Sequence, residues 1–177
     1  MLISLTGITL VAGALLGAVH AVTEEPIAQA AAKARIEAME SILPAFDNNI
    51  VSTVENIDGL DVYTAENGGE MVGKAVETYS DAGFGGRISL LVGFAADGTL
   101  TGYSVLSHAE TPGLGAKMGE WFSAEGTSHN VIGTGAPIAV KADGGEIDAI
   151  TGATITSRAF AEAVNRAREV FEKSSAK

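Results

Sequence analysis

The feature that most constrains this chain is an N-terminal run without a charged side chain. Residues Met1–Val22 (MLISLTGITLVAGALLGAVHAV) contain no Asp, Glu, Lys or Arg. As an α-helix rising about 1.5 Å per residue, such a run is about 30 Å long, which matches the hydrocarbon core of a bilayer. Small residues such as Gly13 and Gly17 would allow neighbouring helices to approach closely. We therefore expect residues 1–22 to form a transmembrane anchor.

A cleaved signal peptide is the alternative for this run, because Val19-His20-Ala21 ends on a small residue. The apolar run is longer than the about 7–15 residues of a usual signal core, and no basic residue precedes it, which favours the anchor. The following residues, Thr23–Pro26, include no Lys or Arg, which fits the non-cytoplasmic side of a membrane. We expect a single-pass protein of the cell (inner) membrane with its domain on the extracytoplasmic, periplasmic side.

Composition narrows the classes of function. The 177 residues carry a formal charge of −11, and an acidic surface repels phosphate backbones, so we expect no nucleic-acid partner. The absence of cysteine excludes disulfides and cysteine-ligated iron–sulfur clusters. His108 and His129 belong to no recognisable nucleophile motif, and we expect neither a catalytic residue nor a metal site.

The remaining sequence predicts an α+β fold. Pro26 is expected to open a connecting helix within residues 23–45, and Pro44 to end it. Short alternating apolar segments predict strands, and a final amphipathic helix is expected over Thr156–Lys173. The expected strands are Ile50–Ile57, Val62–Thr64, Met71–Tyr79, Ile88–Phe94, Leu100–Ser107 and Ile138–Lys141. Together they predict an antiparallel sheet with flanking helices over residues 46–177, preceded by one N-terminal transmembrane helix.

Thr151–Ser157 places four hydroxyls in seven residues directly before the last helix. One interpretation is helix capping, in which Thr156 or Ser157 accepts a hydrogen bond from a free backbone N–H. The other is a phosphate site, because the same free N–H groups and the helix dipole attract a phosphate, and Gly152 and Ala153 have little bulk. The segment alone leaves both open.

The motif Asp148-x-x-Thr151-Gly152-Ala153-Thr154 resembles the flavinylation motif of the FMN-binding domain family. That family includes the G subunit of the Rnf electron-transport complex and the C subunit of the sodium-pumping NADH:quinone reductase. The resemblance implies that Thr154 forms a phosphoester with FMN, made by a separate flavin transferase with FAD as donor. Asp148 then belongs to the part that the transferase recognises, and Thr151, Gly152 and Ala153 complete the motif.

A second segment, His108–Gly115, resembles the family's ETPGLG loop, which lines the flavin. Pro112-Gly113 predicts a tight turn, and an ordinary surface turn is the alternative for that pattern alone. The flavin-lining residues that the resemblance implies are Glu110, Thr111, Gly113, Leu114 and Gly115.

The resemblance covers essentially the whole chain, and the compact spacing fits the Rnf G subunit better than the quinone-reductase C subunit. It implies an electron-carrying subunit, with covalent FMN, of a ferredoxin:NAD⁺ oxidoreductase that transports sodium ions or protons. The chain would be an enzyme only as part of that complex, with other membrane subunits as partners. The alternatives are the quinone-reductase C subunit, or an anchored FMN-binding sensor or structural domain that relays no electrons.

Four aromatic residues near these loops have two interpretations each. Tyr79, Phe84, Trp121 and Phe122 are either rings that stack on a flavin or parts of the core. Lys141 either neutralises the cofactor or is an ordinary solvated lysine.

Overall fold

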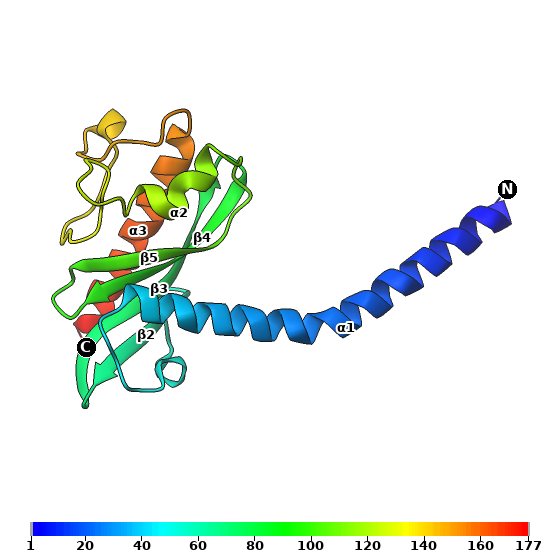
Figure 1. Ribbon diagram of the computed structural model, residues 1–177, viewed down its shortest axis with the longest axis horizontal. Coiled ribbons are helices and arrows are strands. Elements are labelled where there is room, and N and C mark those ends of the chain that lie inside the picture. Colours follow the sequence, from blue (N-terminus) through cyan, green and yellow to red (C-terminus); the bar gives the residue numbers. More distant parts are fainter. Residues whose placement is uncertain (1, 177) are drawn as a thin grey trace. The chain divides into compact units, whose positions relative to one another are not determined.

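The protein, described by a computed structural model over residues 2–176, is an α+β chain, as expected from the sequence (Figure 1). It has a long helix, a five-stranded sheet and a C-terminal helix, with short helical turns between them. The elements are α1 (Leu2–Ile42), η1 (Ile50–Thr53), β1 (Glu55–Ile57), β2 (Leu60–Asn67), β3 (Glu70–Gly83), β4 (Gly86–Ala95), β5 (Leu100–Ser107), η2 (Gly115–Lys117), α2 (Met118–Trp121), η3 (Lys141–Asp143) and α3 (Thr154–Ser175).

The first of two compact units ends at Glu37 and consists of the N-terminal part of α1. Its large apolar side chains from Leu5 to Ile27 are more than 60% exposed, and the helix is long and apolar enough to cross a membrane. Pro26 was expected to open a separate connecting helix, but α1 runs through it without interruption. An interior proline removes one helical hydrogen bond, and the helix can continue on both sides of the proline.

The second unit, from Ala38 onward, contains an antiparallel sheet in the order β1-β2-β3-β4-β5. Every connection is a hairpin between neighbouring strands, with Val76 of β3 opposite Val92 of β4. The predicted turn at Asp97-Gly98 joins β4 to β5, and Gly98 has a φ of 84°. Glycine is favoured in this left-handed region because it has no Cβ to clash.

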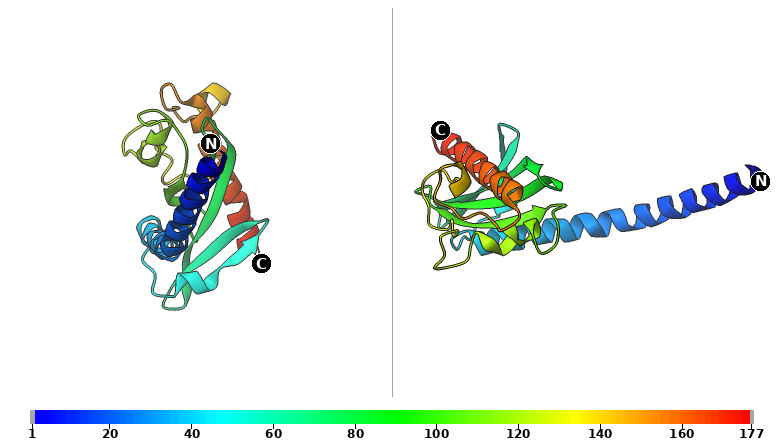
Figure 2. Two further views of the ribbon diagram at one scale, coloured as in Figure 1. Left: turned by 90° about the vertical axis from the view of Figure 1, so that its right-hand side faces the viewer. Right: turned by 90° about the horizontal axis from the view of Figure 1, so that it is seen from above.

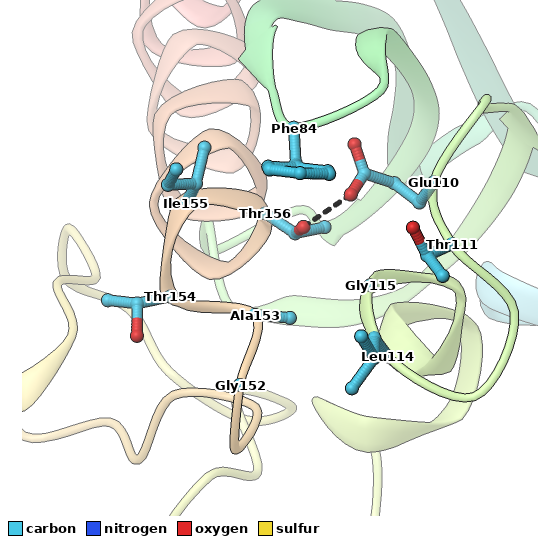
Figure 3. A pocket seen from close by; sticks show the side chains of 10 residues that line it. All are labelled: Phe84, Glu110, Thr111, Leu114, Gly115, Gly152, Ala153, Thr154, Ile155 and Thr156. Carbon is cyan, nitrogen blue, oxygen red and sulfur yellow. Dashed lines mark hydrogen bonds between the residues drawn. The ribbon is translucent and has the colours of Figure 1, made fainter.

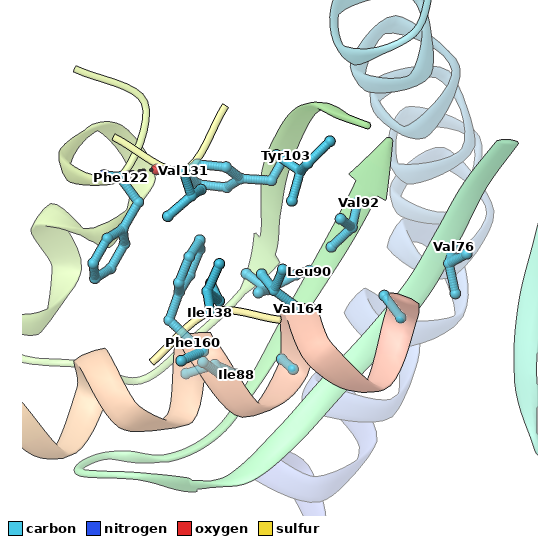
Figure 4. Close-up of a cluster of buried hydrophobic side chains, with 14 of the residues drawn as sticks. Val76, Ile88, Leu90, Val92, Tyr103, Phe122, Val131, Ile138, Phe160 and Val164 are labelled. Atoms are coloured by element: carbon cyan, nitrogen blue, oxygen red, sulfur yellow. Dashed lines mark hydrogen bonds between the residues drawn. The ribbon is translucent and has the colours of Figure 1, made fainter. Parts of the chain in front are cut away.

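The two faces of this sheet bury different apolar clusters. On one face, which α3 covers (Figure 2), Leu90 and Val92 of β4 lie in the same cluster as Phe160 and other residues of α3 (Figure 4). Phe94 of β4 belongs to the same cluster. On the other face, the last turn of α1 and the residue after it supply Met39, Ile42 and Leu43, which are buried with Leu91. The alternation along β4 therefore places apolar side chains on both faces, as in a fully covered strand.

Three further sequence expectations differ from the observed elements. Ile138–Lys141 forms no strand, because only a single parallel bridge, between Val140 and Ile147, pairs this segment. Residues 50–53 form a 3₁₀ turn in place of the start of a strand. Helix α3 begins at Thr154, two residues before the expected start, because the preceding turn is already closed at Ala153 by the hydrogen bond from its N–H to the Ile150 carbonyl.

Candidate functional site

Two loops of the second unit contain turns of the same construction. The Leu114 N–H donates to the Thr111 carbonyl at 3.1 Å, and Gly113 between them has a φ of 78°. The Ala153 N–H donates to the Ile150 carbonyl at 2.9 Å, and Gly152 also has a φ of 78°. A hydrogen bond between the first and fourth residues and a positive φ at the third are the marks of a type II turn. The predicted turn at Pro112-Gly113 is thus confirmed.

These two turns lie against each other. A Cβ built on Gly152 would stand 3.4 Å from Leu114 Cδ2. Between the loops, the tip of the β3–β4 hairpin and the first turn of α3 is a pocket of about 350 Å³ (Figure 3). Seven of the residues expected from the sequence line this pocket: Glu110, Thr111, Leu114, Gly115, Gly152, Ala153 and Thr154. Three more complete the lining, namely Phe84, Ile155 and Thr156.

Glu110 joins three segments at the pocket wall. Its side chain is buried, with 5% of the residue exposed. One carboxylate oxygen accepts a hydrogen bond from the Gly85 N–H at 2.8 Å, and the other accepts one from the Thr156 hydroxyl at 2.5 Å. A Cβ on Gly115 would stand 2.6 Å from Thr156 Oγ1 and 3.0 Å from Glu110 Cβ, so only glycine fits there. The carboxylate thus fastens the β3–β4 turn and α3 to the ETPGLG loop.

The four hydroxyls of the last motif fall into two pairs. Thr156 and Ser157 are buried, and both are engaged in hydrogen bonds. Neither caps α3, contrary to one of the two interpretations above, because the cap position is Ala153, which has no side-chain acceptor. Within residues 2–176, the hydroxyls of Thr151 and Thr154 have no hydrogen-bond partner. Thr154 is half-buried and lines the pocket, whereas Thr151 is exposed and lies outside the lining.

The N-terminus of α3 faces the pocket without a side-chain cap. The Ser157 N–H makes the first intrahelical bond, to the Ala153 carbonyl at 3.0 Å. The N–H groups before it, from Thr154 to Thr156, therefore have no partner within the helix. These groups and the positive end of the helix dipole favour a bound phosphate.

Three expected site residues lie away from the pocket lining. Gly113 and Thr151 occupy the turns beside it, whereas Asp148 lies on the surface. The Asp148 carboxylate pairs with Lys141 Nζ at 2.7 Å and accepts a hydrogen bond from the Ser128 hydroxyl. These two contacts, Lys141 first, hold the pKa of Asp148 below its ordinary value. Among the described residues, no group of His, Asp and Glu side chains is placed to hold a metal ion.

The structure places the four candidate aromatic residues in different surroundings. Phe84 is 71% exposed and lines the pocket. Trp121 stacks on His129 with 4.1 Å between ring centroids, and Phe122 is buried in the core. The guanidinium groups of Arg87 and Arg166 both lie over the ring of Tyr79. Phe84 is therefore the one of the four that is placed at the pocket.

Sequence reasoning missed Ile155 and Thr156 as lining residues. Both directly follow the motif, so the first turn of the helix was the available signal. The contact between Thr156 and Glu110 spans 46 residues. No local pattern indicates it, because it depends on how the loop folds against the helix.

Comparison with known proteins gives the family. Residues 83–169 match the model of the FMN-binding domain, and this range includes every residue that lines the pocket. The G subunit of the ion-translocating oxidoreductase complex of Yersinia pestis is 37% identical over an alignment of 180 positions, which covers 91% of this chain and 86% of that protein. The chain belongs to the family of these G subunits. The family expected from the two motifs is thereby confirmed.

Two further proteins are similar to this chain. The G subunit of the Na⁺-translocating ferredoxin:NAD⁺ oxidoreductase complex of Acetobacterium woodii is 38% identical over 120 residues, covering 64% of this chain and 56% of that protein. A solved structure, the C subunit of the Na⁺-translocating NADH-quinone reductase of Parabacteroides distasonis, is 20% identical with a TM-score of 0.46. The superposed region covers 73% of this chain and 69% of the chain in that structure.

Proposed function

We propose that this chain is an electron-carrying flavoprotein component of an ion-translocating oxidoreductase complex of the ferredoxin:NAD⁺ type. It holds FMN covalently through a phosphoester on Thr154. The observation that carries the proposal is the unpartnered hydroxyl of half-buried Thr154 at the uncapped N-terminus of α3, at the edge of a pocket that Thr154 and the ETPGLG loop both line. Membership of the family of G subunits supports the same function.

The residues present fit the parts of FMN. A phosphate on Thr154 would be held by the free N–H groups of the first turn of α3, which favour its negative charge. Phe84 and Leu114 lie on opposite sides of the pocket and offer apolar surfaces to a flat ring (Figure 3). Thr111 and backbone groups of its loop supply polar partners at the pocket edge.

The chemistry belongs to the cofactor, since bound FMN supplies the capacity to accept and donate one or two electrons. The chain's own residues orient it and limit the access of water. Glu110 keeps the wall closed by holding Gly85 and Thr156, and Gly115 allows the loop to approach α3 closely. No residue of this chain is assigned a catalytic role.

The assembly around the chain follows from the same proposal. Helix α1 anchors it in the membrane as a single span, and the second unit lies on the extracytoplasmic side. A flavin transferase attaches the FMN, and other membrane subunits of the complex exchange electrons with it. A covalent tether suits a carrier outside the cytoplasm, where a lost cofactor is not readily replaced.

The attachment is tested by expressing the chain with a flavin transferase and recording flavin fluorescence in a denaturing gel. Thr154→Ala should abolish the fluorescent band, because it removes the free hydroxyl at the pocket. Thr154→Ser is the matched control: it keeps a hydroxyl at the same position of the pocket lining, and its band should persist. A fluorescent band from Thr154→Ala would contradict the proposed attachment to Thr154.

Electron relay requires a separate measurement. Membranes that carry Thr154→Val should lose ferredoxin-dependent NAD⁺ reduction while the other subunits remain at normal levels. Unimpaired reduction would favour a flavin-binding domain that relays no electrons.

A further inference from the structure

We propose that the short turn η3 clamps the modification segment Asp148–Arg158 at both ends, in the conformation that the flavin transferase modifies. Lys141 and Asp143 are then positioning residues for the attachment reaction. This inference rests on the proposed phosphoester at Thr154. It assigns a role to the two ion pairs of η3, which the pocket itself does not use.

The first end of the segment is held at Asp148. Lys141 Nζ lies 2.7 Å from the Asp148 carboxylate, which also accepts a hydrogen bond from the Ser128 hydroxyl. The main chain is held as well, because the Trp121 indole N–H donates to the Asp148 carbonyl at 3.2 Å. The Lys141 N–H donates to the Ile147 carbonyl at 2.9 Å. Side-chain and backbone contacts thus fix the start of the motif.

The second end is held at Arg158. Its Nε and Nη2 each donate to one oxygen of Asp143 at 2.8 Å, which makes a bidentate ion pair of defined geometry. Arg158 follows Thr154 by four residues, so the two side chains lie on one face of α3, one turn apart. Holding Arg158 therefore fixes the rotation of the turn that carries the Thr154 hydroxyl.

Both anchors come from one three-residue turn, Lys141–Asp143. Its conformation is itself restrained: Gly144 ends it with a φ of 83°, and the Gly145 N–H donates to the Val140 carbonyl at 3.1 Å. Because η3 pairs with both Asp148 and Arg158, it restrains the loop between these two residues. Within that loop, the Ile150–Ala153 turn directly precedes Thr154.

The small stabilisation expected from these two exposed ion pairs indicates a local role for them rather than a contribution to global stability. All four side chains are 40–54% exposed, and ion pairs at such exposed positions contribute little to global stability. The pKa values of Asp143 and Asp148 both lie below the ordinary value, each because of its basic partner first. Both carboxyl groups are therefore ionised at neutral pH. The effect of the two ion pairs should appear in the geometry of the segment, where a misplacement of about 1 Å can slow a reaction by about a hundredfold.

The reaction that this geometry serves is a substitution at phosphorus. Thr154 Oγ1 forms a bond to the flavin-side phosphorus of FAD, the bridging P–O bond breaks, and AMP leaves. The hydroxyl proton passes to a base of the transferase. Neither oxidation nor reduction is involved, and the clamp residues contact none of the reacting atoms.

The experiment measures the initial rate of flavin incorporation into the full-length chain in detergent, with purified transferase and FAD. Lys141→Met and Arg158→Gln should each slow incorporation by about tenfold or more, because each releases one end of the segment. Lys141→Arg, which keeps the charge, should restore the rate. At the other end, the exchanged pair Asp143→Arg with Arg158→Asp should recover most of the rate lost in Arg158→Gln, because that ion pair re-forms while Asp148 is unchanged.

Two matched controls come from ion pairs of similar exposure elsewhere in the chain. Lys173→Met breaks the ion pair with Asp58, and Arg87→Gln breaks the bidentate ion pair with Asp81. Both should incorporate flavin at the wild-type rate. Equal urea midpoints for all variants would show that each remains folded.

The outcomes separate this inference from the proposed function. A wild-type chain that takes up no flavin overturns the attachment and the clamp together. A labelled wild type with an unslowed Lys141→Met overturns the clamp alone. A slow Arg158→Gln that the exchanged pair does not rescue also overturns it, because the transferase then reads the Arg158 guanidinium directly.

Discussion

At the scale of single residues, the pocket depends on a buried carboxylate with two donors. Burying a carboxylate is costly unless its oxygens are hydrogen-bonded. Glu110 meets this condition through the Gly85 N–H and the Thr156 hydroxyl, which come from different segments. The same contacts that make the burial tolerable thus hold the pocket walls together.

We predict that Thr156→Val lowers the free energy of unfolding by about 2 kcal/mol, because it removes a donor to a buried carboxylate. Thr154→Val is the matched control: its hydroxyl is free, and its effect should stay within about 0.5 kcal/mol. Urea denaturation of both variants measures the difference. Equal stability of the two would contradict the role assigned to Glu110.

How far the sequence predicts these residues depends on the range of each interaction. The motif at Asp148–Thr154 and the loop at Glu110–Gly115 were recognisable because each is a short continuous pattern. The contact between Thr156 and Glu110 was not predictable, because it joins residues far apart in the chain. The surface ion pair of Asp148 with Lys141 was equally invisible, since it requires η3 to fold back against the motif.

At the scale of elements, Tyr103 connects β5 to the segment that follows the ETPGLG loop. Its hydroxyl donates to the Met118 carbonyl at 2.6 Å and accepts a hydrogen bond from the Phe122 N–H at 3.2 Å. Burial raises the pKa of Tyr103 to about 12. The neutral side chain is therefore part of the attachment of α2 to the sheet.

A pH dependence follows from this raised pKa. The unfolded chain releases the Tyr103 proton at about pH 10, but the folded protein retains it to about pH 12. This contribution to stability is thus complete below about pH 10 and is lost as the pH rises to about 12, by roughly 2–3 kcal/mol in all. Tyr103→Phe lacks it, so urea denaturation should show the variant less stable near about pH 9, with the difference shrinking toward about pH 12. A constant difference would contradict the prediction.

Elements were predictable where one pattern dominates. The Asp97-Gly98 hairpin and the amphipathic helix α3 carry strong local signals. Pro26 was misleading, because a helix can continue through a proline when the residues on both sides favour it. Ile138–Lys141 was misleading because a short apolar run becomes a strand only beside a pairing partner, and here it has one bridge.

At the scale of the whole molecule, the compact unit also includes residues that the sequence assigns to the connecting helix. Met39, Ile42 and Leu43 are 0–8% exposed and belong to its second core cluster. A Cβ on Gly102 would stand 2.9 Å from Ile42 Cβ, so the missing side chain makes room for the isoleucine. The Thr101 hydroxyl donates to the Ile42 carbonyl at 2.5 Å. The end of α1 is therefore a structural part of the sheet domain.

Two truncations test this boundary. A chain that begins at Ala38 should be recovered in the soluble fraction with an unchanged urea midpoint, because residues 2–37 belong to the other unit. A chain that begins at Phe46 should lose roughly 5 kcal/mol, since each buried Met, Ile or Leu side chain contributes about 1.5–3 kcal/mol. A loss of that size is comparable to the whole stability of many domains. If both truncations unfolded at the same urea concentration, the end of α1 would be a tether alone and not part of the folded domain.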